Sequence, residues 1–291
     1  MKYGFIAEYA HEHSVALMCK VLRVSRSGYY GFAKGEVGIR ELANQKLLEE
    51  IQAVHTTSRE TYGSPRVFRQ LRASGVSCGR HRVARLMAKA GIVARARRRF
   101  RITTRQKAGA RYAPDQLQRS FVAERPHAVW TSDITYIWTA EGWLYLAVVM
   151  DLYSRLIVGW ATSERIDASL VCRAVNSALL RHRPMLKVIF HSDRGSQYTS
   201  NAVRELLDEH LPVPLVASHG TSCYDNAITE SFFHTLKTEC VFFENYQTRQ
   251  EGHRRLFDYI EVFYNRQRLH SSLNYQTPSA VESGFQIKKT A

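Results

Sequence analysis

The spacing of hydrophobic and polar residues changes near residue 126 of this 291-residue chain. Upstream of that point, apolar residues recur three and four positions apart, which is typical of helices that bury one face. Downstream, the segments 131–139, 142–154 and 155–162 are rich in β-branched and aromatic residues and are separated by short connections. This pattern predicts three antiparallel strands. The chain therefore combines a helical N-terminal part with a domain that contains a β-sheet.

Two pairs of predicted helices occupy the N-terminal part. Residues 15–22 form the first helix of one pair, and Ser25 caps the second. In the other pair, Pro65 opens one helix and Ser77 caps the next, and a glycine ends each of them. Both pairs have the pattern of a helix-turn-helix. Helical hairpins that do not bind DNA share this pattern, so spacing alone leaves the function of the first pair open.

Helices and strands alternate after the three predicted strands. The expected elements are a helix at 167–183, a strand at 187–193, a helix at 201–210, a strand at 214–218 and a helix at 226–240. Three antiparallel strands followed by this alternation are typical of a ribonuclease-H-like α/β fold. The predicted domains are 1–58 (helical, with a candidate helix-turn-helix), 59–125 (basic helix-turn-helix and linker), 126–245 (catalytic core) and 246–291 (a helix at 249–264 and a polar tail).

Composition excludes several classes of protein. The longest uninterrupted apolar run has eight residues, whereas a membrane-spanning helix needs about 20. The N-terminus carries acids and histidines where a signal peptide has an apolar stretch, and the five cysteines form no CxxC pair. We therefore expect a cytoplasmic protein with reduced thiols, no membrane contact and no structural zinc site.

Basic residues outnumber acidic ones by 41 to 26, and the excess of +15 is concentrated in residues 59–111. That segment holds 16 basic residues and one acidic residue, which predicts a surface that binds a polyanion. The alternative is a surface that only aids solubility. The predicted nucleic-acid contacts in and beside the second helix pair are Arg66, Arg69, Arg80, Arg82, Arg85, Lys89, Arg95, Arg97, Arg98, Arg99, Arg101, Arg105 and Lys107.

Three carboxylates occupy unusual positions in the predicted fold. Asp133 lies inside a strand, Asp193 ends a buried strand, and Glu230 lies at the edge of the apolar face of a helix. Taken singly, each has an ordinary structural explanation. The ribonuclease-H order brings them together, however, and three such acids favour Mg²⁺ or Mn²⁺. Two ions held there would suit phosphoryl transfer on a phosphodiester.

Two further residues near Glu230 are candidates for DNA contact. Lys237 lies two helical turns after Glu230 on the same face, where its ammonium could contact a phosphate. An exposed helix lysine is the alternative on spacing alone. Asn226 precedes the helix and is expected either to cap it or to contact DNA.

The longest motifs in the chain resemble a known family. They are TSDITYI, GWLYLAVVMDLYSRLIVGW, HSDRGSQYTS, SCYDNAITESFFHTLKTE and FYNRQRLHSSLNYQTPSA, with MCKVLRVSRSGYY and YGSPRVFRQLRASG upstream. Together they resemble bacterial insertion-sequence transposases, specifically the second-reading-frame (OrfB) product of the family named for insertion sequence three. The resemblance extends from Ser14 to Glu282.

The resemblance implies a DDE-type transposase with a core like that of retroviral integrases. Asp133, Asp193 and Glu230 match its three acids, and Lys237 matches the basic position that follows. The implied reaction cuts one strand at the element's end with water, and the new 3′-hydroxyl then attacks another phosphodiester. The implied partners are double-stranded DNA (terminal inverted repeats and target) and further copies of the chain in a synaptic complex. A DNA contact at Arg268 also rests on the resemblance.

Two features depart from the family pattern. The family usually has 35 residues between its second acid and its glutamate, whereas 36 separate Asp193 from Glu230. The additional residue falls in the segment HLPVPLVAS, so we expect the acids to keep their geometry. The family's active enzyme is generally a frameshifted fusion with an upstream helix-turn-helix and leucine zipper. The upstream-frame product is therefore an expected partner for end recognition and full activity.

Two other functions share parts of this pattern. A regulator of transposition would bind DNA through the basic N-terminal half and would not need the carboxylates. A ribonuclease-H-like nuclease would use the same three acids to hydrolyse an RNA–DNA hybrid without joining strands.

Overall fold

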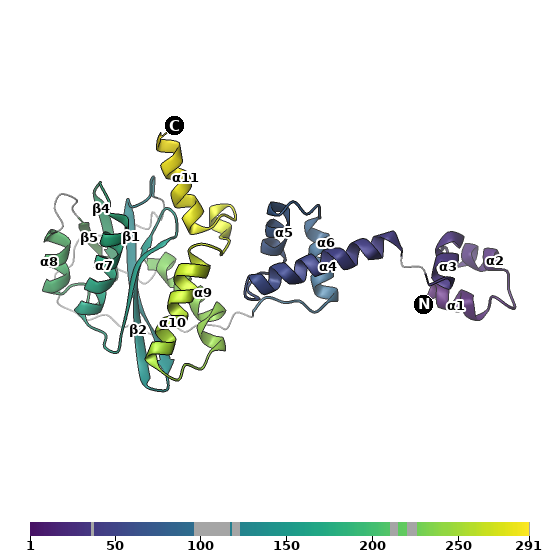
Figure 1. Ribbon diagram of the computed structural model, residues 1–291, viewed down its shortest axis with the longest axis horizontal. Coiled ribbons are helices and arrows are strands. Elements are labelled where there is room, and N and C mark those ends of the chain that lie inside the picture. Colours follow the sequence, from purple (N-terminus) through teal and green to yellow (C-terminus); the bar gives the residue numbers. More distant parts are fainter. Residues whose placement is uncertain (36–37, 96–116, 118–122, 210–214, 220–225, 291) are drawn as a thin grey trace. The chain divides into compact units, whose positions relative to one another are not determined.

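A computed structural model describes residues 1–35, 38–95, 117, 123–209, 215–219 and 226–290. The chain divides into two compact units, residues 1–94 and residues 95–291, which are described separately (Figure 1). No helix among the described residues is both long enough and apolar enough to cross a membrane.

The first three helices form a small group of their own. They are α1 Lys2–Glu8, α2 Val15–Val21 and α3 Arg26–Ala33. Ile6, Met18, Cys19 and Tyr29 form the buried core that joins them. The Ser25 hydroxyl accepts a hydrogen bond from the backbone N–H of Gly28 at 3.1 Å, so the predicted cap is confirmed.

A second group of three helices contains the basic helix pair. Its members are α4 Ile39–Thr57, α5 Ser64–Ala73 and α6 Arg80–Lys89. Pro65 lies in the first turn of α5, and glycines in left-handed backbone conformations follow α5 and α6, as the sequence predicted. The predicted cap at Ser77 is wrong, because Gly79 occupies the N-cap position of α6 and no side chain caps the helix.

A five-stranded mixed sheet forms the centre of the second unit. Its strands are β1 Val129–Thr139, β2 Gly142–Asp151, β3 Ile157–Ser163, β4 Val188–Ser192 and β5 Leu215–His219. The order is β3-β2-β1-β4-β5, with β1, β2 and β3 antiparallel and with β4 and β5 parallel to β1. The predicted meander and the ribonuclease-H-like strand order are confirmed.

Helices cover both faces of this sheet (Figure 1). Helices α7 Ala168–His182 and α8 Asn201–Glu209 pack on one face, and α9 Ala227–Glu239 and α10 Arg249–Phe257 pack on the other. Successive β1 residues serve opposite layers, since Trp130 belongs to the α7 core whereas Val129 packs with Ile228 of α9. A Cβ on Gly159 would lie 2.3 Å from the Ala174 carbonyl oxygen, so only glycine allows this approach of α7 to β3.

The C-terminal region holds more regular structure than predicted. Helix α10 continues into a π-helical stretch, Asp258–Tyr264, so the helix expected at 249–264 is confirmed. The polar tail is a wrong prediction, because Pro278–Thr290 form helix α11.

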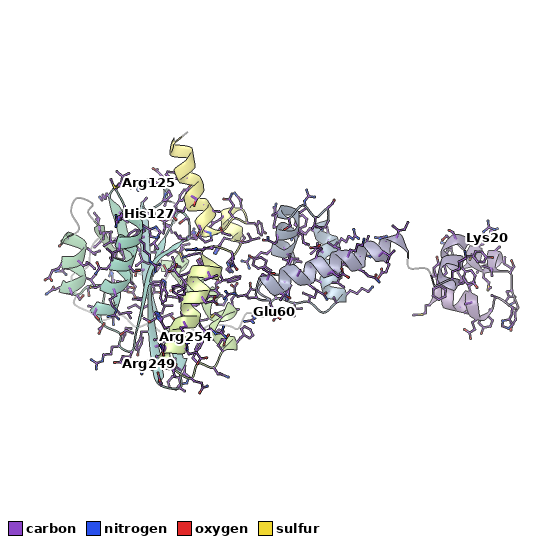
Figure 2. All side chains as sticks on the ribbon, in the orientation of Figure 1. Lys20, Glu60, Arg125, His127, Arg249 and Arg254 are labelled. Carbon is purple, nitrogen blue, oxygen red and sulfur yellow. The ribbon has the colours of Figure 1, made fainter. Side chains whose placement is uncertain are left out.

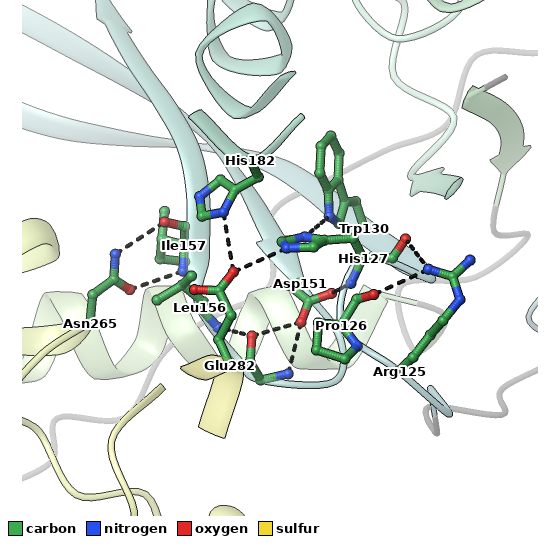
Figure 3. A network of polar contacts seen from close by, with 11 residues as sticks. Arg125, Pro126, His127, Trp130, Asp151, Leu156, Ile157, His182, Asn265 and Glu282 are labelled. Atoms are coloured by element: carbon green, nitrogen blue, oxygen red, sulfur yellow. Dashed lines mark hydrogen bonds and ion pairs between the residues drawn. The ribbon is translucent and has the colours of Figure 1, made fainter. Parts of the chain in front are cut away.

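Polar contacts attach this C-terminal region to the sheet (Figure 3). The Asn265 side chain accepts from the Ile157 N–H at 3.0 Å and donates to the Ile157 carbonyl at 3.1 Å. Glu282 of α11 lies 3.0 Å from His127 Nε2 and 3.2 Å from His182 Nδ1, joining α11 to the start of β1 and the end of α7. These contacts pair both backbone groups of Ile157, the first residue of β3, and hold the last helix.

Candidate active site

Two parallel strands bring the two aspartates together. The pairing of β1 with β4 ends at Ser132 opposite Ser192, and Asp133 and Asp193 are the next residues on each strand. Adjacent parallel strands lie about 4.8 Å apart, so the two carboxylates leave the sheet side by side. Asp193 directly follows β4, and its Oδ1 accepts a hydrogen bond from the Gly195 N–H at 3.0 Å.

Helix α9 supplies the third acid and a lysine, and hydrogen bonds fix it against β1. The Asn226 side-chain amide donates to the Ser132 carbonyl at 3.0 Å. The Thr229 hydroxyl lies 2.8 Å from that of Thr131 and 2.9 Å from Asn226 Oδ1. Glu230, the next residue, is exposed at the start of the helix. Its position on α9 is therefore set by buried contacts immediately before it.

Repulsion within this group is visible in the pKa of Asp133. Burial, Asp193 and Glu230 raise that pKa to about 8, against the opposing effects of the Ile134 N–H and Lys237. Burial also raises the pKa of Glu230. Burial lowers the pKa of Lys237, which Asp133 partly restores. The structure thus brings Asp133, Asp193, Glu230 and Lys237 into one electrostatic group, in which Asp193 and Glu230 raise the pKa of Asp133 more than Lys237 lowers it.

Buried hydroxyls support the same end of β1. The Ser132 hydroxyl donates to the Val148 carbonyl at 2.8 Å, so the Tyr198 hydroxyl, 2.9 Å away, donates to Ser132. Burial, together with Asp133 and Asp193, raises the pKa of Tyr198 well above its ordinary value. Tyr198 is therefore a neutral packing residue beside the acids.

The donor set fits a hard divalent cation, because three carboxylates offer the oxygen ligands that such ions prefer. The ligand atoms of these three carboxylates do not all lie within 4.8 Å of one another. Within the described ranges, the group of three His, Cys, Asp or Glu side chains with ligand atoms all within 4.8 Å is His127, His182 and Glu282. The Trp130 indole N–H donates to His127 Nδ1, so His127 Nε2 carries the proton that faces Glu282. Hydrogen bonds account for that second group without a metal.

Comparisons with known proteins cover both units. Residues 123–211 and residues 230–283 match two family models that are each described as an integrase core domain, and residues 42–100 match an HTH-like domain. Transposase InsF for insertion sequence IS3A of Escherichia coli (strain K12) is 39% identical over 285 residues, which cover 97% of this chain and 99% of that protein.

The chain belongs to the IS3 transposase family. The Insertion element IS600 uncharacterized 31 kDa protein of Shigella sonnei is also 40% identical over 268 residues, or 92% of this chain and 98% of that one. Among solved structures, the HTLV-2 integrase catalytic core domain in complex with magnesium has a TM-score of 0.38 at 15% identity, covering 55% of this chain and 98% of its own.

These findings confirm the predicted family, fold class and activity. The protein is a transposase, an enzyme of the polynucleotidyl transferase class, with an integrase core of the DDE type and an HTH-like N-terminal region.

The predicted DNA contacts of the transposase are distributed unevenly. Arg69, Arg80, Arg85 and Lys89 are exposed on α5 and α6. Arg82 and Lys89 also contact α4, since Arg82 Nε donates to Asn44 Oδ1 at 2.9 Å and Lys89 Nζ lies 3.5 Å from Glu41. The predicted contacts Arg97, Arg98, Arg99, Arg101, Arg105 and Lys107 lie outside the described residues.

Two of the arginines that were predicted to contact DNA lie against aromatic rings. The Arg66 guanidinium lies 5.7 Å from the ring centroid of Tyr62. Arg95 lies 4.7 Å from that of Phe243 and donates to the Glu239 carbonyl at 3.2 Å. Arg95 is therefore attached to the core of the second unit.

Two other predicted DNA contacts of the transposase are corrected by their surroundings. Asn226 is buried and directs its amide to β1, so it neither caps α9 through its side chain nor faces solvent. Arg268 is also buried, and it donates to both carboxylate oxygens of Glu239 at 2.6 and 2.7 Å. The structure therefore favours structural roles for both residues over DNA contact.

Sequence reasoning missed one neighbour of the acids. The Lys237 ammonium lies 4.9 Å from the centroid of the Tyr136 ring, which places an aromatic side chain beside the charged group. The available signal was the alternation along β1, in which Tyr136 and Trp138 are exposed between buried neighbours.

Proposed function

We propose that Asp133, Asp193 and Glu230 are the catalytic, metal-binding acids of this transposase. The observation that supports this most directly is that Asp133 and Asp193 directly follow the last paired residues of two adjacent parallel strands, in a partly buried group that raises the pKa of Asp133. Carboxylates with strongly shifted pKa values are found preferentially at functional sites. The membership of the chain in a transposase family makes a DNA phosphodiester the substrate.

The proposed cofactor is Mg²⁺ or Mn²⁺, most simply as two ions. When bound, divalent ions would activate the attacking oxygen and stabilise the leaving oxygen of the phosphodiester. The Gly195 N–H orients Asp193, and the hydrogen bonds of Thr229 hold Glu230 toward β1. Lys237 offsets part of the acidic group, and although its side chain is only 6% exposed, its ammonium interacts with Asp133, where it would contact a phosphate bound at the acids. The family's reaction uses no covalent protein nucleophile, so the proposed attacking groups are water and then a DNA 3′-hydroxyl.

The proposed DNA partner is the pair of element ends, followed by a target duplex. The basic helices α5 and α6 would neutralise phosphates through the exposed residues Arg69, Arg80, Arg85 and Lys89. Because two ends must be cut and joined to one target, the working assembly is a homo-oligomer, with the upstream-frame product as a further partner.

Strand cleavage and joining test this assignment. The full chain is incubated with Mn²⁺ or Mg²⁺ and with labelled DNA duplexes. These duplexes carry the candidate element ends found in the DNA on either side of its gene. Asp193→Asn and Glu230→Gln are expected to abolish both steps. Asp208→Asn and Glu205→Gln, which alter exposed acids on α8 in the same way, serve as matched controls and should retain them.

The outcomes distinguish the two rival functions. Equal cleavage by the acid variants and the parent would overturn the catalytic assignment. DNA binding that is unchanged by divalent metal and confined to the N-terminal half would identify a regulator. Hydrolysis of an RNA–DNA hybrid without strand joining would identify a nuclease.

A further inference from the structure

The hairpin formed by β1 and β2 exposes a group of aromatic rings. Tyr136, Trp138 and Trp143 are 41%, 60% and 43% exposed, although the other two tryptophans of the chain are buried. Trp138 and Trp143 are cross-strand partners with ring centroids 4.9 Å apart, and Trp143 and Tyr136 have centroids 5.1 Å apart. Single exposed rings are ordinary, whereas a contiguous group indicates a binding surface.

This aromatic group lies next to the acids along β1. Tyr136 follows Asp133 by three residues, about 10 Å along an extended strand, so the two side chains leave opposite faces of β1. Among the described residues, β4 pairs with β1 only as far as Ser132, which leaves that edge of β1 open beyond the acids. Lys237 joins the two faces around this edge, because its ammonium lies 4.9 Å from the Tyr136 ring and interacts with Asp133.

The other end of the aromatic group also adjoins a cation. Arg249, labelled in Figure 2, donates from its backbone N–H to Glu141 at 2.8 Å and from Nε to the Trp143 carbonyl at 3.2 Å. Its guanidinium lies 3.6 Å from Glu164, which is mostly exposed. Exposed rings between two cations are the combination by which proteins hold unpaired nucleotides, since bases stack on the rings and phosphates meet the charges.

We infer that Tyr136, Trp138 and Trp143 form a platform that stacks unpaired bases of the DNA strand whose phosphodiester lies at the acids. The inference rests on the proposed function, because continuity with the acid site is what identifies a DNA strand as the occupant. Stacking tolerates any sequence, since every base presents a π face. The platform would therefore hold a strand that has separated from its complement at the cut end, without reading which bases it carries.

Binding to paired and unpaired DNA ends tests the platform. The affinity of the full chain, in EDTA, is measured for a blunt duplex and for the same duplex with an unpaired end. The basic helices contact both, so the ratio of the two affinities isolates the platform. Tyr136→Leu, which keeps apolar volume but removes the ring, is expected to reduce the preference for the unpaired end about fivefold to hundredfold.

Three further variants control for damage to the fold. Trp138→Leu alters the most exposed ring, so it leaves packing nearly intact and should still reduce the preference. Trp143→Phe keeps a ring and should retain most of it. Phe257→Leu alters a ring that is 48% exposed on α10, away from the platform, and should change nothing. Thermal unfolding of each variant is compared with that of the parent.

Fluorescence locates the contact. Unpaired DNA should quench tryptophan emission in the parent, and the double variant Trp138→Phe/Trp143→Phe should lose the quenching because Trp130 and Trp160 are buried. The inference is overturned if well-folded Tyr136→Leu and Trp138→Leu variants keep the parental preference, or if the double variant is still quenched. Loss of self-association in these variants with unchanged DNA preference would likewise overturn it by identifying a protein-binding surface.

Cleavage by the parent is scored on the same DNA, which separates the two proposals. If the parent cleaves DNA and the acid variants do not, while the ring variants keep the parental preference for unpaired ends, only the platform is overturned. If the ring variants lose the preference for unpaired ends but the parent never cleaves, the result supports the platform as a DNA site. It then overturns only the catalytic assignment.

Discussion

Two groups of carboxylates in the second unit have opposite electrostatic character. Asp133 is surrounded by further acids and by burial, and its pKa rises to about 8. Glu282 is also partly buried, yet hydrogen bonds from His127 and His182 outweigh that burial and lower its pKa to about 2. Both lie near β1, one beyond its pairing with β4 and the other at its beginning.

The difference shows that burial opposes ionisation in both groups, and that the partners of each carboxylate decide whether this effect is overcome. The Glu282 group is complete within the chain and holds α11 in place (Figure 3). In the Asp133 group, Lys237 offsets only part of the effect that burial and the other acids have on the pKa of Asp133, so the group gains from a cation supplied from solution. A structural carboxylate and a functional one can therefore be distinguished by whether the protein itself satisfies the charge.

Substitution in the group that contains Asp133 should have the largest effect on activity. Asp133→Asn is expected to reduce strand cleavage on the order of 10⁴-fold or more, as for one member of an interdependent catalytic unit. In EDTA at pH 7 the same variant should unfold at the parental temperature or above it, because it removes an acid whose burial beside other acids is unfavourable. Mn²⁺ should raise the unfolding temperature of the parent and not of the variant. A variant that is destabilised in EDTA would contradict the comparison.

Glu239 is a third carboxylate, and like Glu282 it is paired with side chains of the protein itself. Arg268 donates two hydrogen bonds to Glu239, and both side chains are almost entirely buried. Arg268→Met removes the arginine charge from buried Glu239, to which the Tyr259 hydroxyl still donates at 2.9 Å, and should lower the free energy of unfolding by about 3–5 kcal/mol. Denaturant unfolding measures this loss. The double variant Arg268→Met/Glu239→Leu should recover part of it, and a double variant no more stable than the single one would argue against the pair.

The partial partner of Asp133 offers a graded test. Lys237→Met keeps the apolar stem that packs in α9 and removes the ammonium. A lost hydrogen bond to a charged group costs about 1.5–3 kcal/mol, so cleavage should fall roughly tenfold to hundredfold. The loss should appear mainly in the KM for DNA, and Lys237→Arg should recover part of it. An unchanged KM with reduced kcat would place Lys237 in the chemical step instead.

The smallest expected effect concerns Glu282. Its pKa is lower folded (about 2) than its ordinary value of 4.5, so its contribution is fully present above about pH 5 and is lost as pH falls toward 2. Glu282→Gln should therefore destabilise the protein at pH 7, by roughly 1–2 kcal/mol after allowance for partial exposure. The difference from the parent, measured by denaturant unfolding, should shrink below pH 4.5. A difference independent of pH would show that the charge is irrelevant.

Local patterns were sufficient to predict the fold and to nominate the three acids. Alternation along β1 and β2 predicted the meander, and an aspartate inside such a strand is anomalous on residue preferences alone. The order of later elements then placed Asp193 beside Asp133. The assignment of all three acids to catalysis remains a prediction that the experiments above test.

Long-range contacts explain what the sequence did not reveal. Asn226 and Arg268 are polar residues in polar segments, and nothing local shows that their partners are Ser132 and Glu239, far away in the chain. Helix α11 was missed because its anchoring residue, Glu282, depends on two histidines from other elements. The Ser77 cap failed because a serine two residues too early cannot reach the first turn of α6.

The unequal lengths of β1 and β4 have a further consequence. Although β1 is central in the strand order, beyond Ser132 it resembles an edge strand on its β4 side within the described part of the chain. An open edge is a template for pairing with another chain, and natural sheets discourage this with charged side chains. Asp133 is the first β1 residue past that pairing. The acid proposed for catalysis is therefore also a residue of the kind that, when ionised, discourages another strand from adding at this edge.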